Sequence, residues 1–319
     1  MNRRKFLQTA ASLLSATAFP ELAFGEESSS RIRILNKIAG EDLASLREVL
    51  EVQPELPVEP IDSGLKLKVD RWPIVIYNLS TTTKENGVEI GVESRGSAFV
   101  LNNNGFFLTA NHVYMPDEGI MMLVYDPVKG YALSATPLAS SEDFDLFLGR
   151  VHFPRDFSIP PTRICSSHNP SSNMVYTTGY TNNEYLTSII KEVIGTGKFT
   201  SECGPNVPCF KLGRLLPQID NWDELRAIVG IGNLTDTTYE DGTPLCEKGE
   251  RSFIAEIVPG NSGSPVLDIH NRLVGILTER SSATVASGDL PAGHKVKHGI
   301  YTGPERIREM IESYIEACE

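Results

Sequence analysis

From residue 73 onwards the chain is a succession of short apolar or alternating runs, each closed by Gly, Asn, Asp or Pro. Runs of this kind predict β-strands, and the residues that close them predict tight turns. Asn102-Asn103-Asn104-Gly105 lies between two such runs and is typical of a tight hairpin. Because many short strands must close or pack on themselves, we expect an all-β fold of two β-barrels.

The expected strands fall into two groups, separated by a Pro/Ser-rich interval at 154–173. Before the interval they are 73–79, 86–92, 96–102, 105–110, 120–126, 130–136 and 145–151. After it they are 174–180, 186–196, 208–215, 227–234, 251–257, 264–269, 272–278 and 297–301, with loops expected at 216–225 and 281–296. The sequence therefore predicts a first barrel over residues 71–155 and a second over 156–319.

Helices are expected at the two ends of the chain. Apolar residues recur at helical spacing between Glu41 and Glu51, within an N-terminal extension (26–70) whose first part, 26–40, is polar and expected to be loose. At the other end, Thr302-Gly303-Pro304-Glu305 begins an amphipathic helix with one apolar stripe. We expect this terminal helix to dock on the second half.

The N-terminus has the composition of a targeting segment. Asn2-Arg3-Arg4-Lys5-Phe6-Leu7-Gln8 precedes a mildly apolar run, and Ala23-Phe24-Gly25 supplies the small residues that a signal peptidase reads. Paired arginines and weak hydrophobicity resemble a twin-arginine export signal, with a basic amphipathic helix as the alternative. We therefore expect residues 1–25 to be a signal peptide and the protein to be exported, to a bacterial periplasm or outside the cell.

Charge and cysteine content narrow the classes of partner. A formal charge of −12 argues against nucleic acid, and no apolar run is long enough to predict a membrane span. No metal-ligand spacing or phosphate-binding glycine loop occurs, so we expect no cofactor and no metal. In an oxidising compartment some cysteines should pair, and Cys203 with Cys209 would close a short loop, although the pairing stays open. An odd number leaves at least one cysteine free or bonded to another molecule. The five are Cys165, Cys203, Cys209, Cys246 and Cys318.

Residues 259–266, Pro-Gly-Asn-Ser-Gly-Ser-Pro-Val, surround one serine with small residues. Glycine permits a tight turn that exposes Oγ of Ser262 and aims backbone N–H groups at one point, where an oxyanion would form in acyl transfer. An ordinary surface loop is the alternative. A serine hydroxyl needs a base within hydrogen-bond reach, and that base needs an orienting partner.

His112 and Asp145 are the candidates for these two roles. His112 follows the apolar run 106–110, which would place its imidazole at a strand-to-loop edge, open to a cleft. Asp145 precedes the apolar run 146–148, as an orienting carboxylate should. Asp143, two residues earlier, would point to the same face of a strand and is the competitor.

These three segments resemble the catalytic blocks of trypsin-like serine peptidases and follow the His, Asp, Ser order of the chymotrypsin fold. Three further stretches agree with that family: 96–100, 273–278 and 298–302. The resemblance covers roughly residues 72–317. It implies a double six-stranded β-barrel of the chymotrypsin type, with a C-terminal helix and, here, an N-terminal helical extension.

The resemblance also implies roles for single residues. Ser262 would be the nucleophile, His112 the general base and then acid, and Asp145 the group that holds the imidazole tautomer. The backbone N–H groups of Gly260 and Ser262 would form the oxyanion hole.

The resemblance also implies which residues form the substrate pocket. By the family pattern Glu256 would lie at the base of the pocket, while Thr278, Glu279 and Arg280 would line its wall. A carboxylate at the base would favour a basic substrate side chain, and Arg280 facing inward an acidic one. Both charges could instead face solvent, so the residue preference stays open.

The chain departs from trypsin itself at Asn261, where trypsin has an aspartate, and it lacks an Ile-Val-Gly-Gly start to the expected mature chain. Activation by a buried new N-terminus is therefore not expected. Asn-Ser-Gly-Ser-Pro resembles bacterial secreted glutamyl endopeptidases and, less closely, HtrA/Deg peptidases, although too few residues follow Tyr301 for a PDZ domain. We expect a serine endopeptidase that cleaves protein or peptide substrates through an acyl-enzyme. The alternatives are a catalytically silent scaffold that acts as a binding module and, third, an esterase for small acyl groups.

Overall fold

The structure is a computed structural model of the chain. It describes residues 32–51, 74–84, 87–116, 120–126, 131–151, 153, 162–165, 174–177, 209–211, 230–235, 250–254, 260–268, 272–284 and 295–319. The expected signal peptide, the joint at 154–161 and 166–173, and the expected strand 186–196 lie outside these ranges. The predicted domain boundaries therefore stay predictions.

Strands of the first half form one sheet with the order β1-β6-β5-β2-β3-β4-β7. They are β1 (Arg33–Ile34), β2 (Ile74–Lys84), β3 (Gly87–Val100), β4 (Phe106–Ala110), β5 (Ile120–Asp126), β6 (Tyr131–Ser141) and β7 (Leu146–Val151). β7 also pairs with β6, so the ladder that runs from β6 through β3 to β7 returns to its starting strand. This arrangement lets alternate side chains fill the enclosed space.

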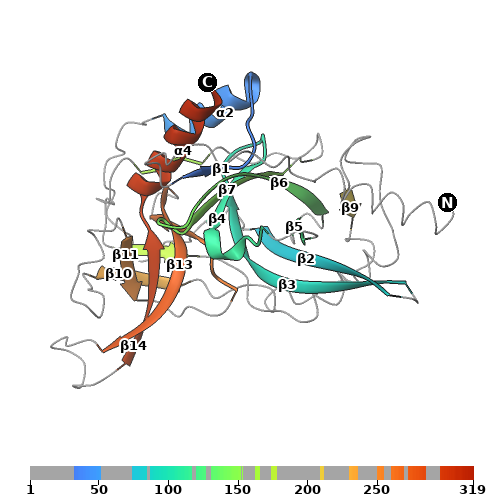
Figure 1. Cartoon of the computed structure of the whole chain (residues 1–319). Helices are drawn as coiled ribbons and strands as arrows, with labels where there is room; N and C mark the ends of the chain where they lie inside the picture. The colour runs from blue at the N-terminus through green and yellow to red at the C-terminus, as the bar shows by residue number, and fades with distance from the viewer. Residues whose placement is uncertain are drawn as a thin grey trace.

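Strands of the second half form a closed barrel in the order β10-β11-β14-β13-β12-β8. They are β8 (Met174–Thr177), β10 (Gly230–Thr235), β11 (Glu250–Ile254), β12 (Pro265–Asp268), β13 (Leu273–Thr284) and β14 (Lys295–Thr302). Figure 1 shows the hairpin of β13 and β14 projecting from one end of the molecule and that of β2 and β3 from the other.

Three expectations about strands need correction. The expected strands 86–92 and 96–102 overlap one continuous strand, β3 (Gly87–Val100), because its ladder with β2 continues through the polar residues between them. The expected loop 281–296 is strand at both ends, since the antiparallel pairing of β13 with β14 continues out to Thr284 and Lys295. The segment 208–215, assigned to the second group, contains β9 (Cys209–Lys211), which pairs with β6 of the first sheet.

The tight hairpin expected at 102–105 is confirmed. Gly105 takes a positive φ of 81°, and its N–H donates to the Asn102 carbonyl at 3.1 Å. A side chain at Gly105 would meet the Val151 carbonyl oxygen at 1.7 Å, so only glycine fits where the turn passes β7.

The two expected helices are present as α2 (Glu41–Leu50) and α4 (Pro304–Cys318). They lie side by side in Figure 1, and α4 also contacts β13. Their apolar stripes share one buried cluster with side chains from both halves of the chain, including Leu46, Leu108, Leu273 and Ile311. The terminal helix thus packs on the N-terminal extension as well as on the second half. Neither of these described helices is long and apolar enough to cross a membrane.

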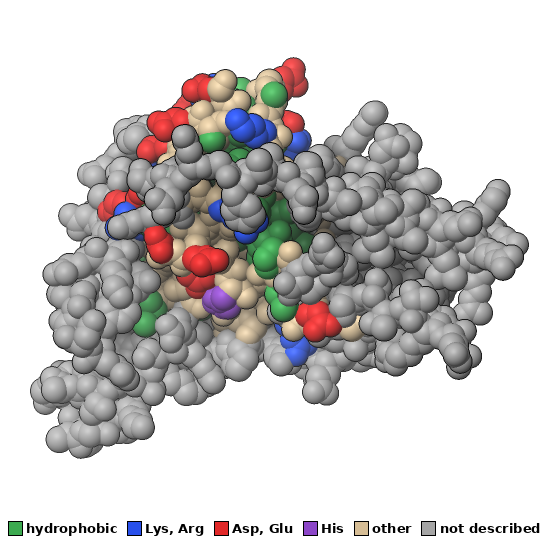
Figure 2. All heavy atoms as spheres, in the orientation of Figure 1, with side chains coloured by type: hydrophobic (Ala, Val, Ile, Leu, Met, Phe, Trp, Pro, Cys, Tyr) green, Lys and Arg blue, Asp and Glu red, His purple; other side chains and the backbone are tan. Residues whose placement is uncertain are grey.

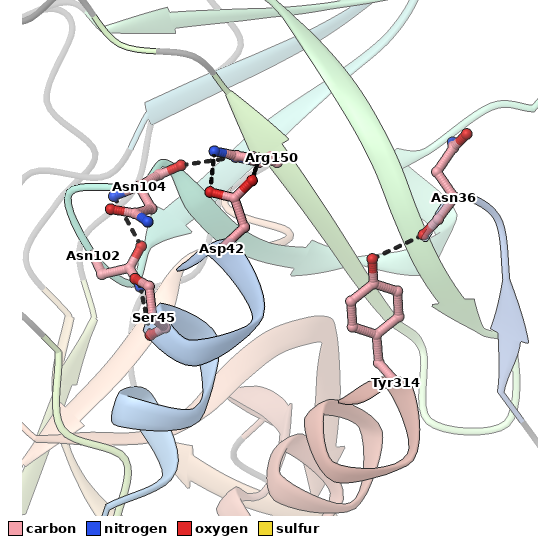
Figure 3. A network of polar contacts seen from close by, with 7 residues as sticks. All are labelled: Asn36, Asp42, Ser45, Asn102, Asn104, Arg150 and Tyr314. Carbon is pink, nitrogen blue, oxygen red and sulfur yellow. Dashed lines mark hydrogen bonds and ion pairs between the residues drawn. The ribbon is translucent and has the colours of Figure 1, made fainter. Parts of the chain in front are cut away.

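The extension is anchored by polar contacts as well as by its apolar stripe (Figure 3). Asp42 of α2 receives two hydrogen bonds from Arg150 of β7, at 2.5 and 2.6 Å. Ser45 of α2 contacts the Asn102 amide, and the Tyr314 hydroxyl of α4 donates to the Asn36 carbonyl at 2.8 Å. The expectation that residues 26–40 are loose is wrong for the described residues 32–40. There β1 pairs with β6, and Asn36 bonds to Pro137 through its side chain and to Tyr314 through its carbonyl.

Candidate active site

His112 lies in a single turn of 3₁₀ helix, η1 (Asn111–Val113), directly after β4. Every residue of β4 is buried, and so is Val113, which fixes the turn from both sides. The His112 side chain, between these anchors, is half exposed. Figure 2 shows histidine and acidic side chains exposed next to each other on this face of the molecule.

Asp145 binds the histidine turn through three oxygen atoms. Its Oδ2 lies 2.7 Å from Nδ1 of His112, its Oδ1 accepts the His112 backbone N–H at 2.9 Å, and its carbonyl accepts the Asn111 N–H at 3.0 Å. Its φ of 47° is the only positive value among the described residues other than glycine. Strained backbone of this kind is concentrated at functional sites. The competitor Asp143 is exposed on the same turn, and the carboxylate on the imidazole is that of Asp145.

Ser262 lies in a turn (260–264, the serine turn) that is held by hydrogen bonds within the second half of the chain. Gly260 and Gly263 have φ values of 98° and 85°. The Gly263 N–H donates to the Leu277 carbonyl of β13 at 2.7 Å, and the Ser264 N–H donates back to the Asn261 carbonyl at 2.9 Å. The turn is therefore tied both to itself and to the neighbouring strand.

Ser97 of β3 holds the same turn from the first half. Its N–H donates to the Ser262 carbonyl at 2.8 Å, and its hydroxyl donates to the Gly260 carbonyl at 2.9 Å. The Ser97 carbonyl accepts the hydroxyl of Thr109 at 2.7 Å, and Thr109 lies three residues before His112 in the sequence. A side chain at Gly263 would lie 1.9 Å from that carbonyl oxygen, so this approach requires glycine.

The histidine turn and the serine turn meet at Gly96. A Cβ atom on Gly96 would lie 2.7 Å from Cγ1 of Val113 and 3.0 Å from the carbonyl oxygen of Ser262. Val113 follows His112 directly, so the structure brings the blocks that carry His112, Asp145 and Ser262 to one place. These blocks are separated by 33 residues between His112 and Asp145 and by a far longer stretch up to Ser262.

The sequence matches a family model described as a trypsin-like peptidase domain over residues 96–276. This match spans more than half of the 319 residues and includes all three blocks. The chain belongs to the trypsin-like peptidase family. The family points to a serine peptidase acting on peptides or proteins, and the strand-rich architecture fits a chymotrypsin-like β fold. A comparison with curated proteins gives no match.

The oxyanion hole of this trypsin-like domain is expected to consist of the backbone N–H groups of Gly260 and Ser262. The Asn261 carbonyl accepts the Ser264 N–H within the serine turn. Since C=O and N–H of a trans peptide point in opposite directions, the Ser262 N–H points away from the inside of this turn. Among the described residues, neither the Gly260 N–H nor the Ser262 N–H donates to a protein acceptor.

The expected substrate pocket is described only at Thr278. This residue follows Leu277, which contacts the serine turn, and its hydroxyl donates to the Ile300 carbonyl at 3.2 Å. Thr278 is buried. Glu256 and the side chains of Glu279 and Arg280 lie outside the described residues, so the pocket stays a prediction.

Ser97 and Thr109 form hydrogen bonds at the site, and the sequence analysis predicts no role for either residue. Ser97 lies in a stretch that resembles the family. Its acceptors are backbone carbonyls, and because every residue type has a carbonyl, the sequence cannot indicate them. Cys165 and Cys318 are free thiols, and the side chains of the other three cysteines lie outside the described residues. Within the described ranges, no group of three or more His, Cys, Asp and Glu side chains could hold a metal ion.

Proposed function

We propose that this chain is an exported serine endopeptidase that hydrolyses peptide bonds through an acyl-enzyme, with Ser262, His112 and Asp145 as its triad. The observation that carries the proposal is the 2.7 Å contact between Nδ1 of His112 and the Asp145 carboxylate. It lies beside a serine turn fixed in a glycine-dependent conformation. A carboxylate that occupies Nδ1 directs Nε2 to the chemistry.

In the proposed reaction, Oγ of Ser262 attacks the substrate carbonyl carbon while Nε2 of His112 takes the hydroxyl proton. The tetrahedral intermediate collapses as His112 returns that proton to the leaving amine, which leaves an ester on Ser262. Water then attacks the ester, with His112 again as base, and releases the acid and the free enzyme. Throughout, Asp145 stabilises the imidazolium cation and keeps its orientation.

Backbone N–H groups of Gly260 and Ser262 are proposed to stabilise the oxyanion. The outward direction of the Ser262 N–H and the fixed turn around it support this role. Loss of one such donor typically lowers turnover by about 10²–10³-fold.

Several finer features belong to the same proposal. The closed barrel of the second half and the returning ladder of the first support a double six-stranded barrel. The Asn-Ser-Gly-Ser-Pro motif supports a relation to secreted glutamyl endopeptidases and, less closely, to HtrA/Deg peptidase domains. The twin-arginine-like residues 1–25 support export to the periplasm or the medium.

A peptide-library cleavage profile, recorded for wild type and Ser262→Ala side by side, tests the function. We expect cleavage by wild type and none by Ser262→Ala. Ser264→Ala is a matched control, because the Ser264 hydroxyl is buried without a hydrogen-bond partner among the described residues. No cleavage by folded wild type, or equal cleavage by Ser262→Ala, would overturn the proposal. Biological activity that survives Ser262→Ala would favour the binding module.

A further inference from the structure

Two buried hydroxyl groups donate hydrogen bonds from one half of the molecule to the other. One reaches the turn that ends at Asp145 and the other reaches the turn that carries Ser262, and these are called the catalytic turns below. The Thr302 hydroxyl, in β14 of the second half, donates to the Phe144 carbonyl of the first half at 2.6 Å. The Ser97 hydroxyl, in β3 of the first half, donates to the Gly260 carbonyl of the second half at 2.9 Å. Each half thus holds the catalytic turn of the other half.

The Thr302 hydroxyl binds the carbonyl of Phe144, the residue directly before Asp145. The turn at 141–145 is also closed locally, because the Asp145 N–H donates to the Glu142 carbonyl at 3.2 Å and the Phe144 N–H donates to the Ser141 hydroxyl at 3.3 Å. Asp145 leaves the turn at a φ of 47°, a conformation that a residue with a side chain rarely adopts. Surrounding contacts must hold such a residue in place. Both Thr302 and Phe144 are almost fully buried, so water cannot replace the bond.

The Ser97 bond acts on the peptide between Gly260 and Asn261. Gly260, at a φ of 98°, has no Cβ to restrict its rotation, so the orientation of its neighbouring peptides depends on their hydrogen bonds. Ser97 is fully buried and grips the turn twice, through its hydroxyl at Gly260 and its N–H at Ser262. Loss of the hydroxyl would remove the bond to the Gly260 carbonyl and keep the N–H bond to the Ser262 carbonyl.

We propose that Thr302 and Ser97 are positioning residues, Thr302 for the Asp145–His112 pair and Ser97 for the oxyanion turn. This inference rests on the proposed function. It implies that each catalytic turn reaches its working geometry only when the opposite half is docked. The two residues act on different parts of the site, so their loss should give different signatures.

Thr302→Val removes the hydroxyl and keeps the shape, whereas Thr302→Ser keeps the hydroxyl and removes the methyl group. The readout is the low-field proton resonance of the His112 Nδ1–H, observed in protein labelled with ¹⁵N-histidine, together with kcat and KM. We expect Thr302→Val to broaden or shift this resonance and to lower kcat at least about tenfold with KM unchanged. Thr302→Ser should retain both.

Ser97→Ala removes one atom from a buried side chain. We expect kcat to fall by about 10–100-fold, less than the loss of a whole oxyanion donor, with KM unchanged. The ¹⁵N–¹H resonances of Gly260 and Ser262 should move, whereas the His112 Nδ1–H resonance should not. Thr177→Val is the control, because it removes an equally buried hydroxyl bond to a backbone carbonyl, that of Pro265 at 2.8 Å, and should leave kcat and all three resonances unchanged.

A folded Thr302→Val with wild-type kcat and an unshifted His112 resonance would overturn the role of Thr302. A folded Ser97→Ala with wild-type kcat would overturn that of Ser97. If Ser97→Ala does not fold, the Thr302→Val and Thr302→Ser pair decides whether cross-half anchoring exists. If wild type itself is inactive, the proposed function has failed. The resonances then still report whether the hydroxyl groups hold the two turns.

Discussion

The carboxylate of Asp145 holds His112 at two points, the ring nitrogen Nδ1 at 2.7 Å and the backbone N–H at 2.9 Å. An ionised carboxylate only accepts hydrogen bonds, so a neutral imidazole paired with one carries its proton on Nδ1. The backbone bond fixes the position of the turn, and the ring bond fixes the tautomer. Both are needed if Nε2 is to act as a base.

Replacing Asp145 by asparagine should disturb the tautomer while keeping the shape. The amide can donate to Nδ1, which would move the ring proton to Nε2 and block its use as a base. We expect kcat to fall about 10⁴-fold with little loss of stability. Asp143→Asn is the matched control on the same turn and should retain full activity. Equal losses in steady-state assays of the two variants would contradict the assignment of Asp145.

Gly263→Ala tests the close approach of Ser97 to the serine turn. Its Cβ would lie 1.9 Å from the Ser97 carbonyl and 2.1 Å from the Thr109 hydroxyl, in addition to the strain of a positive φ. Gly40→Ala, also at a positive φ, meets no atom within 4 Å and carries strain alone. Urea unfolding should show Gly263→Ala to be the more destabilising by about 1–3 kcal/mol, the range for overpacking. A smaller loss for Gly263→Ala than for Gly40→Ala would show that the turn is not held as described.

The candidate site could be predicted from the sequence where its chemistry lies in short blocks. His112 is the second residue after the buried strand β4 and Asp145 directly precedes β7, so local patterning points to both. The hydroxyl bonds of Ser97 and Thr302 could not be predicted, because they reach backbone carbonyls 163 and 158 residues away. Any residue type offers such a carbonyl.

For the fold too, local patterns could be predicted and long-range contacts could not. Helices α2 and α4 and most strands follow from the periodicity of apolar residues within each segment. The docking of residues 32–40 does not, since the polar Asn36 bonds to Pro137 and Tyr314, both more than a hundred residues away. The partner of β9 was mispredicted for a similar reason. A three-residue strand carries too little pattern to specify the sheet it joins.

The ion pair of Arg150 with Asp42 should contribute measurably to the docking of the N-terminal extension. The two side chains are 17% and 32% exposed and share two hydrogen bonds, so their coupling should exceed that of a surface pair. A double-mutant cycle with Arg150→Met and Asp42→Asn should give about 1–2 kcal/mol in chemical unfolding. The more exposed pair Arg306 and Glu309 should give about 0.5 kcal/mol or less. Equal coupling in the two cycles would contradict the anchoring.

Alkaline pH should destabilise the fold through Cys165. Burial, aided by the Asp268 carboxylate, raises the pKa of this thiol from 9.0 to about 12. The unfolded chain therefore loses the thiol proton first, so the stabilisation is complete below pH 9 and is lost as the pH rises toward about 12. Urea midpoints measured across this window should fall less steeply in Cys165→Ala than in wild type. Parallel curves would contradict this origin, as would alkylation of Cys165 as fast in the folded protein as in urea.

Covalent labelling by a fluorophosphonate probe, followed by mass-spectrometric mapping of the modified residue, tests the triad most directly. The probe captures only a serine that a neighbouring base has activated. We predict a single adduct on Ser262 in the folded wild-type protein and no adduct in His112→Ala. A folded wild-type protein that stays unlabelled, or that carries the adduct on another serine, would contradict the triad of Ser262, His112 and Asp145.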